Sequence, residues 1–284
     1  GDLWTLAEGD DFYSSPTLSH DGRQLAWISW RHPNMPFDST RLWIADRDET
    51  GHFGPGRVVA GGATESVLQP RFSPDGHLTF VSDRSGWANL YRFEGDDLIA
   101  LCPMDAEFAQ PQWTFGTHDY DYADAETIIC AYRQHGRSHL ARVPVGQGTL
   151  HPLELPYSSV REMYTSDDAL YLIGASPTTP SALVRYTLAN AETTALARST
   201  GDALDAAHIS VAEAISFPMG QDETAHAFFY PPANADFQGP AARRPPCVVF
   251  SHGGPTSATT DEWRPLIQFW TSRGFAVVDV NYRG

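Results

Sequence analysis

One strand-turn-strand pattern recurs along the first two hundred residues, and it limits the possible folds more than any other feature of the chain. The stretches "SSPTLSHDGRQLAWISW" (14–30) and "LQPRFSPDGHLTFVSDR" (68–84) share a proline, an apolar residue two positions later, a serine, an Asp-Gly turn and then alternating apolar residues. Alternation of this kind is typical of half-buried strands, and Asp-Gly is typical of the turn between them. Recurrence of one such unit indicates a repeat architecture.

Two further copies of the pattern are more divergent. "AQPQWTFGTHDYDYADAETIICAY" (109–132) keeps the proline and has a longer acidic turn, and "SSVREMYTSDDALYLIG" (158–174) keeps only the turn. Each copy is followed by two more short runs of strand character: "RLWIADRD", "NLYRFEGD", "HLARVPVG" and "ALVRYTLA", then "RVVAGG", "LIALCPM", "LHPLELP" and "TTALARS". Four short strands in a unit of about 40–50 residues are typical of a β-propeller blade.

We therefore predict a mainly β fold, in which residues 1–205 form part of a β-propeller with four recognisable blades. The run "DLWTL" at the start resembles a third strand without the two before it, so we expect the propeller to be truncated within a blade at its N-terminus. A β-sandwich is the alternative. It would not need the same signature to recur four times in phase.

The sequence pattern changes after residue 205. A proline- and alanine-rich passage (231–246) is typical of an exposed connector, and "CVVFS" (247–251) fits a strand buried on both faces. A glycine-containing loop follows, then a helix with Leu266, Ile267, Phe269 and Trp270 on one face, then a second buried strand, "FAVVDVNYRG". Strand, loop, helix and strand in this order predict a right-handed crossover in a parallel sheet.

These last motifs resemble a known family. The "HGGP" loop between "VVFS" and the helix, followed by "FAVVDVNYRG", is similar to the beginning of the α/β-hydrolase domain of the prolyl oligopeptidase family of serine peptidases, in its acylaminoacyl-peptidase or dipeptidyl-aminopeptidase-like branch. The "SPDG" turns and "FFYPP" extend the resemblance over essentially the whole chain. It implies a partial propeller over 1–205 and the N-terminal portion of the hydrolase domain over 206–284, truncated before the nucleophile.

The resemblance also implies which residues act. Acyl transfer at a peptide carbonyl develops a negative oxygen, which backbone N–H groups held in advance stabilise. By resemblance, Gly253 and Gly254 supply one such oxyanion-hole donor, and His252 orients the loop. Tyr282 and Arg283 are candidates for lining the substrate cleft, with closure of the strand as their alternative role.

The nucleophile of an α/β-hydrolase lies on a G-x-S-x-G elbow, and this chain has none. The nearest match, Gly136-Arg137-Ser138-His139-Leu140, lacks the second glycine and lies in a predicted blade. We therefore expect this chain to lack the Ser-Asp-His triad of its parent protein, and the segment alone to be inactive.

The predicted function is that of a segment of a serine peptidase of the aminopeptidase or oligopeptidase type, acting on short peptides. In the family the propeller caps the catalytic cleft and restricts access to small substrates. One alternative is an esterase or lipase-like α/β-hydrolase, which uses a similar glycine loop. The other is a non-catalytic β-propeller that binds a protein or a sugar. Hydrolysis of aminoacyl-arylamides, and not only of esters, distinguishes a peptidase.

Composition excludes several other classes. The formal net charge of −16 argues against binding to nucleic acid or to an anionic membrane. All 19 basic residues are arginine, so a P-loop and a Schiff-base lysine are both excluded from this segment. The histidines have no metal-ligand spacing, and we predict no metal and no cofactor. The expected partners are short peptides and the remainder of the hydrolase domain.

The cysteines and the first residues of the chain give information about the cellular compartment of the protein. Cys102, Cys130 and Cys247 are far apart and flanked by apolar residues, which predicts buried small hydrophobic side chains in a reducing compartment. The first residues carry no signal-peptide pattern, and no apolar run is long enough to cross a bilayer. We therefore expect a cytoplasmic protein.

Overall fold

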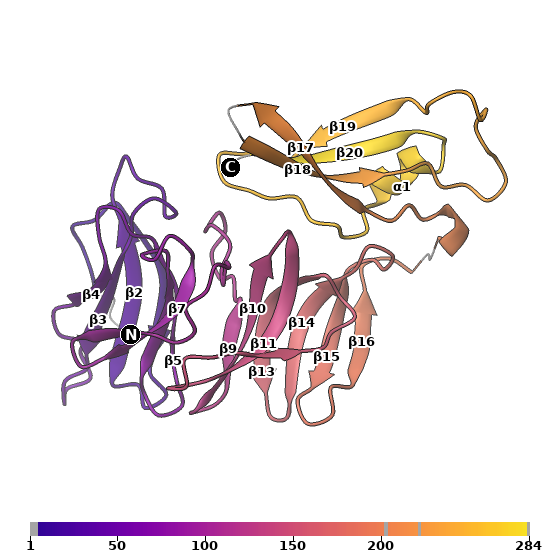
Figure 1. The fold of residues 1–284 in the computed structure, drawn as a ribbon. Helices are drawn as coiled ribbons and strands as arrows, with labels where there is room; N and C mark the ends of the chain where they lie inside the picture. Colours follow the sequence, from indigo (N-terminus) through magenta and orange to yellow (C-terminus); the bar gives the residue numbers. More distant parts are fainter. Residues whose placement is uncertain (1–4, 202–203, 221–222, 283–284) are drawn as a thin grey trace. The chain divides into compact units, whose positions relative to one another are not determined.

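A computed structural model describes residues 5–201, 204–220 and 223–282, which contain five four-stranded sheets (Figure 1). The chain divides into two compact units, each treated by itself below. The first contains Gly1–Gln134, Leu140–Glu154 and Arg161–Leu170, and the second contains His135–His139, Leu155–Val160 and Tyr171–Gly284. Most of the run "DLWTL" lies outside the described residues, so its expected strand character stays a prediction.

Four of the sheets are meanders whose strands follow one another in sequence order. This confirms that each predicted repeat forms a four-stranded unit. The first two sheets consist of β1 (Phe12–Leu18), β2 (Gln24–Trp30), β3 (Arg41–Asp46) and β4 (Arg57–Gly61), then β5 (Val67–Phe72), β6 (Leu78–Ser82), β7 (Asn89–Glu94) and β8 (Asp97–Ala100). The next two consist of β9 (Tyr120–Asp124), β10 (Thr127–Gln134), β11 (Arg137–Pro144) and β12 (His151–Leu153), then β13 (Ser159–Ser166), β14 (Ala169–Ala175), β15 (Ala182–Thr187) and β16 (Thr193–Arg198).

The repeated sequence motif has a local structural cause in the first two sheets. In the turn between β5 and β6, the Ser73 hydroxyl donates to Asp75, and Ser73 Oγ accepts the backbone N–H of His77 at 2.8 Å. Gly76 follows with a φ of +93°, a left-handed conformation that glycine adopts without steric cost. The serine, aspartate and glycine of the repeat therefore form one self-contained turn.

The repeated proline marks a β-bulge in the first strand of each of these two sheets. The strand register shifts between Ser14 and Thr17 and again between Leu68 and Arg71. In both bulges the residue before the proline has positive φ, 53° at Ser15 and 50° at Gln69. An extra residue of this kind bends the strand and strengthens its twist, which accounts for the shared sequence spacing.

The third repeat is placed differently from the prediction. Its first strand, β9, begins at Tyr120, and Pro111 and Trp113 lie in an irregular loop before it. The proline at 111 therefore does not mark a bulge as Pro16 and Pro70 do. The loop from 109 to 119 is an insertion that the strand pattern alone did not separate from β9.

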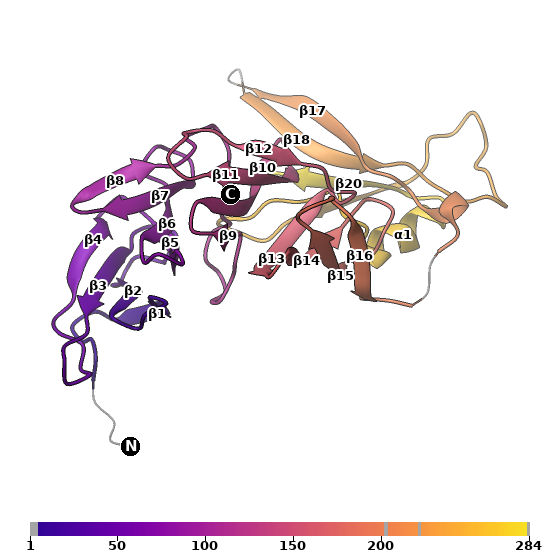
Figure 2. The same ribbon diagram turned by 90° about the horizontal axis from the view of Figure 1, so that it is seen from below.

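Apolar side chains pack neighbouring sheets of the first unit together. One cluster joins the first sheet to the second and includes Ile28, Leu42, Val67 and Phe80, all at or near zero exposure. A second cluster joins the second sheet to the third through residues that include Leu90, Phe108, Ile128 and Cys130. The first two sheets lie side by side in both ribbon views (Figures 1 and 2). Sheets that share cores in series are typical of a propeller-like domain.

The second unit contains a sheet of a different kind. Its strands β17 (Glu213–Gly220), β18 (Glu223–Tyr230), β19 (Cys247–Ser251) and β20 (Ala276–Asn281) have the order β17-β18-β20-β19. β19 and β20 are parallel and are joined through helix α1 (Pro265–Thr271), which confirms the predicted strand-loop-helix-strand crossover. The predicted boundary at residue 205 falls between β16 and β17, and the assignment of 1–205 and 206–284 as domains stays a prediction.

Three predictions about burial in this region were wrong in part. Side chains of β19 alternate between exposed and half-buried, with Val249 65% exposed, so the strand is not buried on both faces. Cys102 and Cys130 are buried as predicted, but Cys247 is exposed at the start of β19. In α1 the packed side of the helix carries Ile267, Gln268 and Thr271, whereas Leu266 and Phe269 are exposed. Val248 and Phe250 of β19 and Ile267 of α1 pack in one cluster with Phe228 and Val277, and the residues on the opposite sides of β19 and α1 lie outside this cluster.

Candidate active-site loop

The HGGP loop leaves the end of β19 and is held by the residue that follows β20. The imidazole of His252 stacks on the ring of Tyr282, with ring centroids 4.0 Å apart and planes 8° from parallel. The Tyr282 hydroxyl donates to the His252 carbonyl oxygen at 2.9 Å. Two separate contacts therefore fix the first residue of the loop against the neighbouring strand.

Both ring nitrogens of His252 face backbone carbonyl oxygens. Nδ1 lies 2.6 Å from the Gly253 oxygen, and Nε2 lies 3.1 Å from the Tyr282 oxygen. A neutral imidazole carries one N–H and donates to one of these oxygens at a time. In this arrangement the ring is engaged with the loop and the strand, which suits an orienting role better than proton transfer to a substrate.

The two glycines that follow lie on an exposed part of the loop. A Cβ atom at Gly254 would lie 3.1 Å from the Tyr282 hydroxyl, and a Cβ at Gly253 would meet nothing within 4 Å. A residue larger than glycine at 254 would therefore crowd the Tyr282 hydroxyl, while the space beside Gly253 is open. The peptide bond between Gly254 and Pro255 is cis.

A buried carboxylate anchors the second half of the loop to β20. Asp279 is 1% exposed, and its Oδ2 accepts hydrogen bonds from Thr259 Oγ1 and Arg264 Nη2. Thr259 also donates its backbone N–H to Asn281 Oδ1 at 3.2 Å. Burial lowers the pKa of Arg264, but the hydrogen bond and charge of Asp279 outweigh it, so the net shift is upward. Arg264 therefore stays charged beside the Asp279 carboxylate.

A second buried carboxylate, Asp261, ties the same loop to other segments of the second unit. The Asp261 side chain is completely buried. It accepts from Ser158 Oγ at 2.6 Å and from Arg137 Nε at 3.1 Å. Trp263 also donates its backbone N–H to the Ser176 oxygen at 2.8 Å. The loop thus has fixed points at both ends and in its middle.

Of the predicted site residues, the structure brings together His252, Gly253, Gly254 and Tyr282. Arg283 lies outside the described residues. Asp261 and Asp279 were not among the predicted site residues. An available signal was the single charged residue in the otherwise apolar run "FAVVDV".

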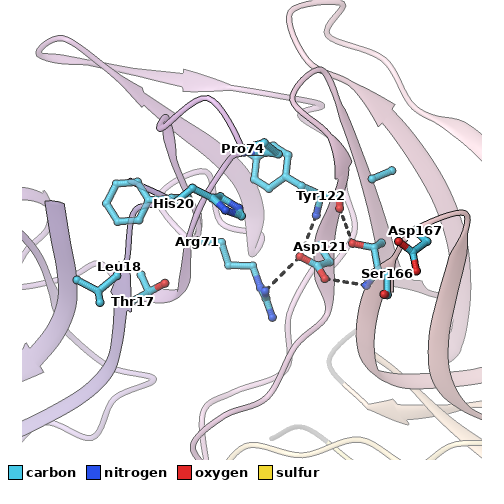
Figure 3. A pocket seen from close by; sticks show the side chains of 12 residues that line it. Thr17, Leu18, His20, Arg71, Pro74, Asp121, Tyr122, Ser166 and Asp167 are labelled. Carbon is cyan, nitrogen blue, oxygen red and sulfur yellow. Dashed lines mark hydrogen bonds and ion pairs between the residues drawn. The ribbon is translucent and has the colours of Figure 1, made fainter. Parts of the chain in front are cut away.

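The first unit has a pocket of about 420 Å³ where the first strands of the four meander sheets end (Figure 3). β1, β5, β9 and β13 each contribute, through Thr17, Arg71, Asp121 and Thr165 among others. Arg71 Nη1 lies 3.1 Å from Asp121 Oδ1, and Asp121 Oδ2 accepts the Thr165 backbone N–H at 2.8 Å. The first strands therefore converge on one polar centre, as the innermost strands of propeller blades do.

In the residues that the structure describes, no group of three or more His, Cys, Asp or Glu side chains is placed to hold a metal ion. Among the helices of the same residues, none is long and apolar enough to cross a membrane.

Comparison with solved structures decides the family. A crystal structure of puromycin hydrolase superposes with a TM-score of 0.90 and 33% sequence identity, over 96% of this chain and 42% of that protein. A puromycin-hydrolyzing peptidase of Mycobacterium tuberculosis gives a TM-score of 0.92 and 32% identity, over 98% of this chain and 42% of the other. The chain belongs to the prolyl oligopeptidase family of serine peptidases.

More distant members of the prolyl oligopeptidase family share the fold. Prolyl oligopeptidase B from Galerina marginata, bound to a 25mer macrocyclization substrate, has a TM-score of 0.74 at 14% identity, over 96% of this chain and 37% of that one. No protein-family model and no curated protein sequence matches the chain. The chain spans about 42% of the length of the puromycin hydrolases that it resembles. The resemblance seen in the HGGP and SPDG motifs is confirmed.

Proposed function

We propose that this chain is the propeller segment and the first hydrolase crossover of a serine peptidase that acts on short peptides. The observation that carries the proposal is the HGGP loop, held by Tyr282 and Asp279 at the end of a parallel crossover. Similarity at 32–33% identity to puromycin-hydrolyzing proteins supports a hydrolytic parent protein. Residues 1–205 are then a partial propeller of four blades, and residues 206–284 are the beginning of an α/β-hydrolase domain.

In this proposal the glycine loop supplies one donor of the oxyanion hole. The backbone N–H of Gly253 or Gly254 donates to the substrate carbonyl oxygen as it becomes negative, which is worth about 3–4 kcal/mol of transition-state stabilisation for one donor. Because the loop is held in place before the substrate arrives, little reorganisation is needed during the reaction. His252 and Tyr282 position the loop, and Arg283 is a candidate contact to substrate.

The nucleophile, the acid and the catalytic histidine are assigned to the part of the protein outside this segment. The first strands of the propeller converge on one polar centre. We infer that the propeller acts as a cap that admits only small peptides to the cleft. The 284-residue segment by itself is then inactive towards peptides. An esterase shares the glycine loop, so the choice of substrate in the test separates the two enzymes.

The proposal is tested with the whole protein that contains this segment. We expect labelling by a fluorophosphonate and hydrolysis of aminoacyl-arylamides as well as esters. The isolated segment is expected to give neither. Hydrolysis of esters with no hydrolysis of arylamides would favour the esterase, and labelling of the segment alone would show that the nucleophile lies within it.

The assigned role of the loop is tested by Gly254→Ala in the whole protein. The added Cβ meets the Tyr282 hydroxyl at 3.1 Å, so the loop or the ring must shift. We expect kcat to fall about 10–100-fold with little change in KM, because a displaced oxyanion donor acts on the transition state. Gly239→Ala is the matched control, since a Cβ there meets nothing within 4 Å. An equal fall in kcat in the two variants would contradict a catalytic role for the loop.

A further inference from the structure

The turn between β10 and β11 belongs to the second unit, although most of both strands belongs to the first. We define the hairpin tip as residues 135–139. His135 and Gly136 both have positive φ, 53° and 76°, which reverses the chain within two residues. A Cβ atom at Gly136 would lie 3.4 Å from Cζ of Phe228 in β18. The hairpin tip therefore packs against the sheet from which the HGGP loop departs.

Within the hairpin tip, Arg137 reaches a buried carboxylate in the second half of the HGGP loop. Nε of Arg137 lies 3.1 Å from Oδ2 of Asp261, whose side chain is completely buried. Oδ1 of the same carboxylate accepts a hydrogen bond from Ser158 Oγ at 2.6 Å. Ser158 is itself held by the hairpin tip, because its carbonyl oxygen accepts the backbone N–H of Ser138 at 2.8 Å. Both of these donors to Asp261 therefore depend on the position of one turn.

The glycine end of the loop has little packing of its own. From Gly253 to Ala258, each residue except Thr256 is exposed to solvent. The positions of the two glycines are therefore set by the anchored residues on either side, which are His252 before them and Thr259 and Asp261 after them. An oxyanion donor must lie within about 0.5 Å of its productive position. A shift of the anchor at Asp261 moves the same short stretch that carries the donor.

The pair of Arg137 and Asp261 contributes a defined geometry more than it contributes stability. Replacing a buried ion pair by apolar side chains of similar volume is often neutral or stabilising, because charges lose their hydration on burial. The Arg137 side chain is 56% exposed, so solvent screens part of its attraction to Asp261. The charge-assisted hydrogen bond nevertheless fixes the direction in which the carboxylate points. The pair is therefore better suited to fixing the loop than to stabilising the fold.

We propose that Arg137 and Asp261 are positioning residues for the oxyanion hole, so that the hairpin tip of the third meander sheet contributes to the rate of acyl transfer. This inference rests on the proposed peptidase function, and it adds a second role to that of the cap proposed for the propeller. Neither residue has to touch the substrate. Their effect is carried through the loop to the backbone N–H of Gly253 or Gly254.

The test is Arg137→Met in the whole protein, which removes the charge and keeps a long side chain. We expect kcat to fall about tenfold with KM nearly unchanged, because a displaced oxyanion donor weakens only the binding of the transition state. Arg137→Lys keeps a positive charge and is expected to recover part of the loss. Active sites are counted by complete labelling with a fluorophosphonate, so that kcat refers to folded enzyme only.

Arg31→Met is the matched control. Arg31 pairs with Asp10 in the first unit, and the two side chains are 55% and 5% exposed. The corresponding values for Arg137 and Asp261 are 56% and 0%. The same substitution therefore removes an ion pair of similar burial that lies outside the loop. We expect kcat per labelled site to stay within about twofold of the wild-type value.

A double-mutant cycle with Asp261→Asn tests whether the two residues act as one pair. Once Asp261→Asn has weakened the pair, Arg137→Met has little left to remove, so the double variant should be only slightly slower than Asp261→Asn alone. A double variant whose loss is the product of the two single losses would contradict the proposal.

The outcomes separate the inference from the proposed function. A wild-type protein that is not labelled and cleaves no aminoacyl-arylamide would overturn the proposed function, and the inference with it. Wild-type activity per labelled site in Arg137→Met would overturn the inference alone, even if the melting temperature falls, because the pair would then only stabilise the fold. A raised KM with unchanged kcat would also overturn it, since the hairpin tip would then act in substrate binding.

Discussion

His118 shows how one half-buried ring responds to its surroundings. It stands edge-on to Tyr164, with ring centroids 4.6 Å apart. The pKa of His118 is lowered to about 4, mainly by burial and also by the charge of Arg71, while the charges of Asp121 and Asp119 oppose the shift. The native protein therefore keeps this imidazole neutral at pH values where an unfolded chain binds a proton.

This shift has a predictable effect on stability. Between pH 6.5 and about pH 4 the unfolded state binds a proton at His118 that the native state does not, so stability falls as the pH is lowered through this window. Allowing for partial exposure, we expect His118 to contribute about 1–2 kcal/mol of that loss. Urea denaturation of the wild type and of His118→Asn over this range measures it. The variant should lose less stability on acidification, and parallel curves would contradict the prediction.

At the scale of elements, strand β20 and helix α1 are joined by the ion pair of Asp279 and Arg264. Removing one member of a buried pair leaves the other charge without compensation. Because Arg264 is partly exposed, we expect Asp279→Asn to cost about 1–3 kcal/mol. Hydrogen exchange of the amides in α1 and β20 is the measurement, and both segments should lose protection.

A matched control for this substitution is available in the same unit. Asp236 is 74% exposed at its side chain and lies 3.7 Å from His208. Asp236→Asn removes the same charge from a solvated position, so we expect little change in exchange. Equal loss of protection in the two variants would show that charge alone, and not the buried pair, controls the stability of these elements.

The meander sheets could be predicted from sequence because their turns and strands are defined by residues that are close together in the chain. Ser73, Asp75 and Gly76 make a turn with hydrogen bonds among themselves, and alternation then defines the two strands on either side. The insertion from 109 to 119 could not be predicted in this way. Its proline resembles those of the first two repeats, but Gln112 contacts Ser14 in β1 and Trp113 contacts Phe37, both distant in sequence.

The crossover element illustrates a second limit. Its order of strand, helix and strand followed from periodicity, but the side chains that pack beneath α1 did not. Gln268 is 2% exposed because its amide pairs with both backbone groups of Ser210, at 2.8 Å and 3.1 Å. The apolar Leu266 and Phe269 point elsewhere and are exposed. A buried polar side chain with a partner 58 residues away leaves no local signal.

Within the candidate site, the glycines and His252 were recognisable because the motif is contiguous. Tyr282 was predicted only as a candidate for lining the cleft and Asp279 was not predicted at all, since both reach the loop from the far end of the crossover. The sequence motif therefore suggested a role for the loop, and the structure shows the contacts that hold the loop in place.

At the scale of the whole molecule, the net charge of −16 creates a negative field around this segment. If the parent enzyme cleaves peptides with free amino groups, that field increases the rate at which these peptides associate with the enzyme. We expect kcat/KM for such peptides to fall several-fold as the salt concentration rises from about 0.01 M to 0.5 M, because the screening length shortens. N-acetylated versions of the same peptides are the control, and the same salt dependence for both would remove steering as the cause.

The meander topology has a consequence for how such a chain arises. In the described residues, each of the four meander sheets pairs its four strands in sequence order. A duplicated stretch of gene that encodes one sheet therefore brings a finished hydrogen-bonding unit with its own turns. The near-identical bulges at Ser15 and Gln69 are the kind of feature that copies of one module would share, and the loop from 109 to 119 is where the third repeat departs from the pattern of the first two.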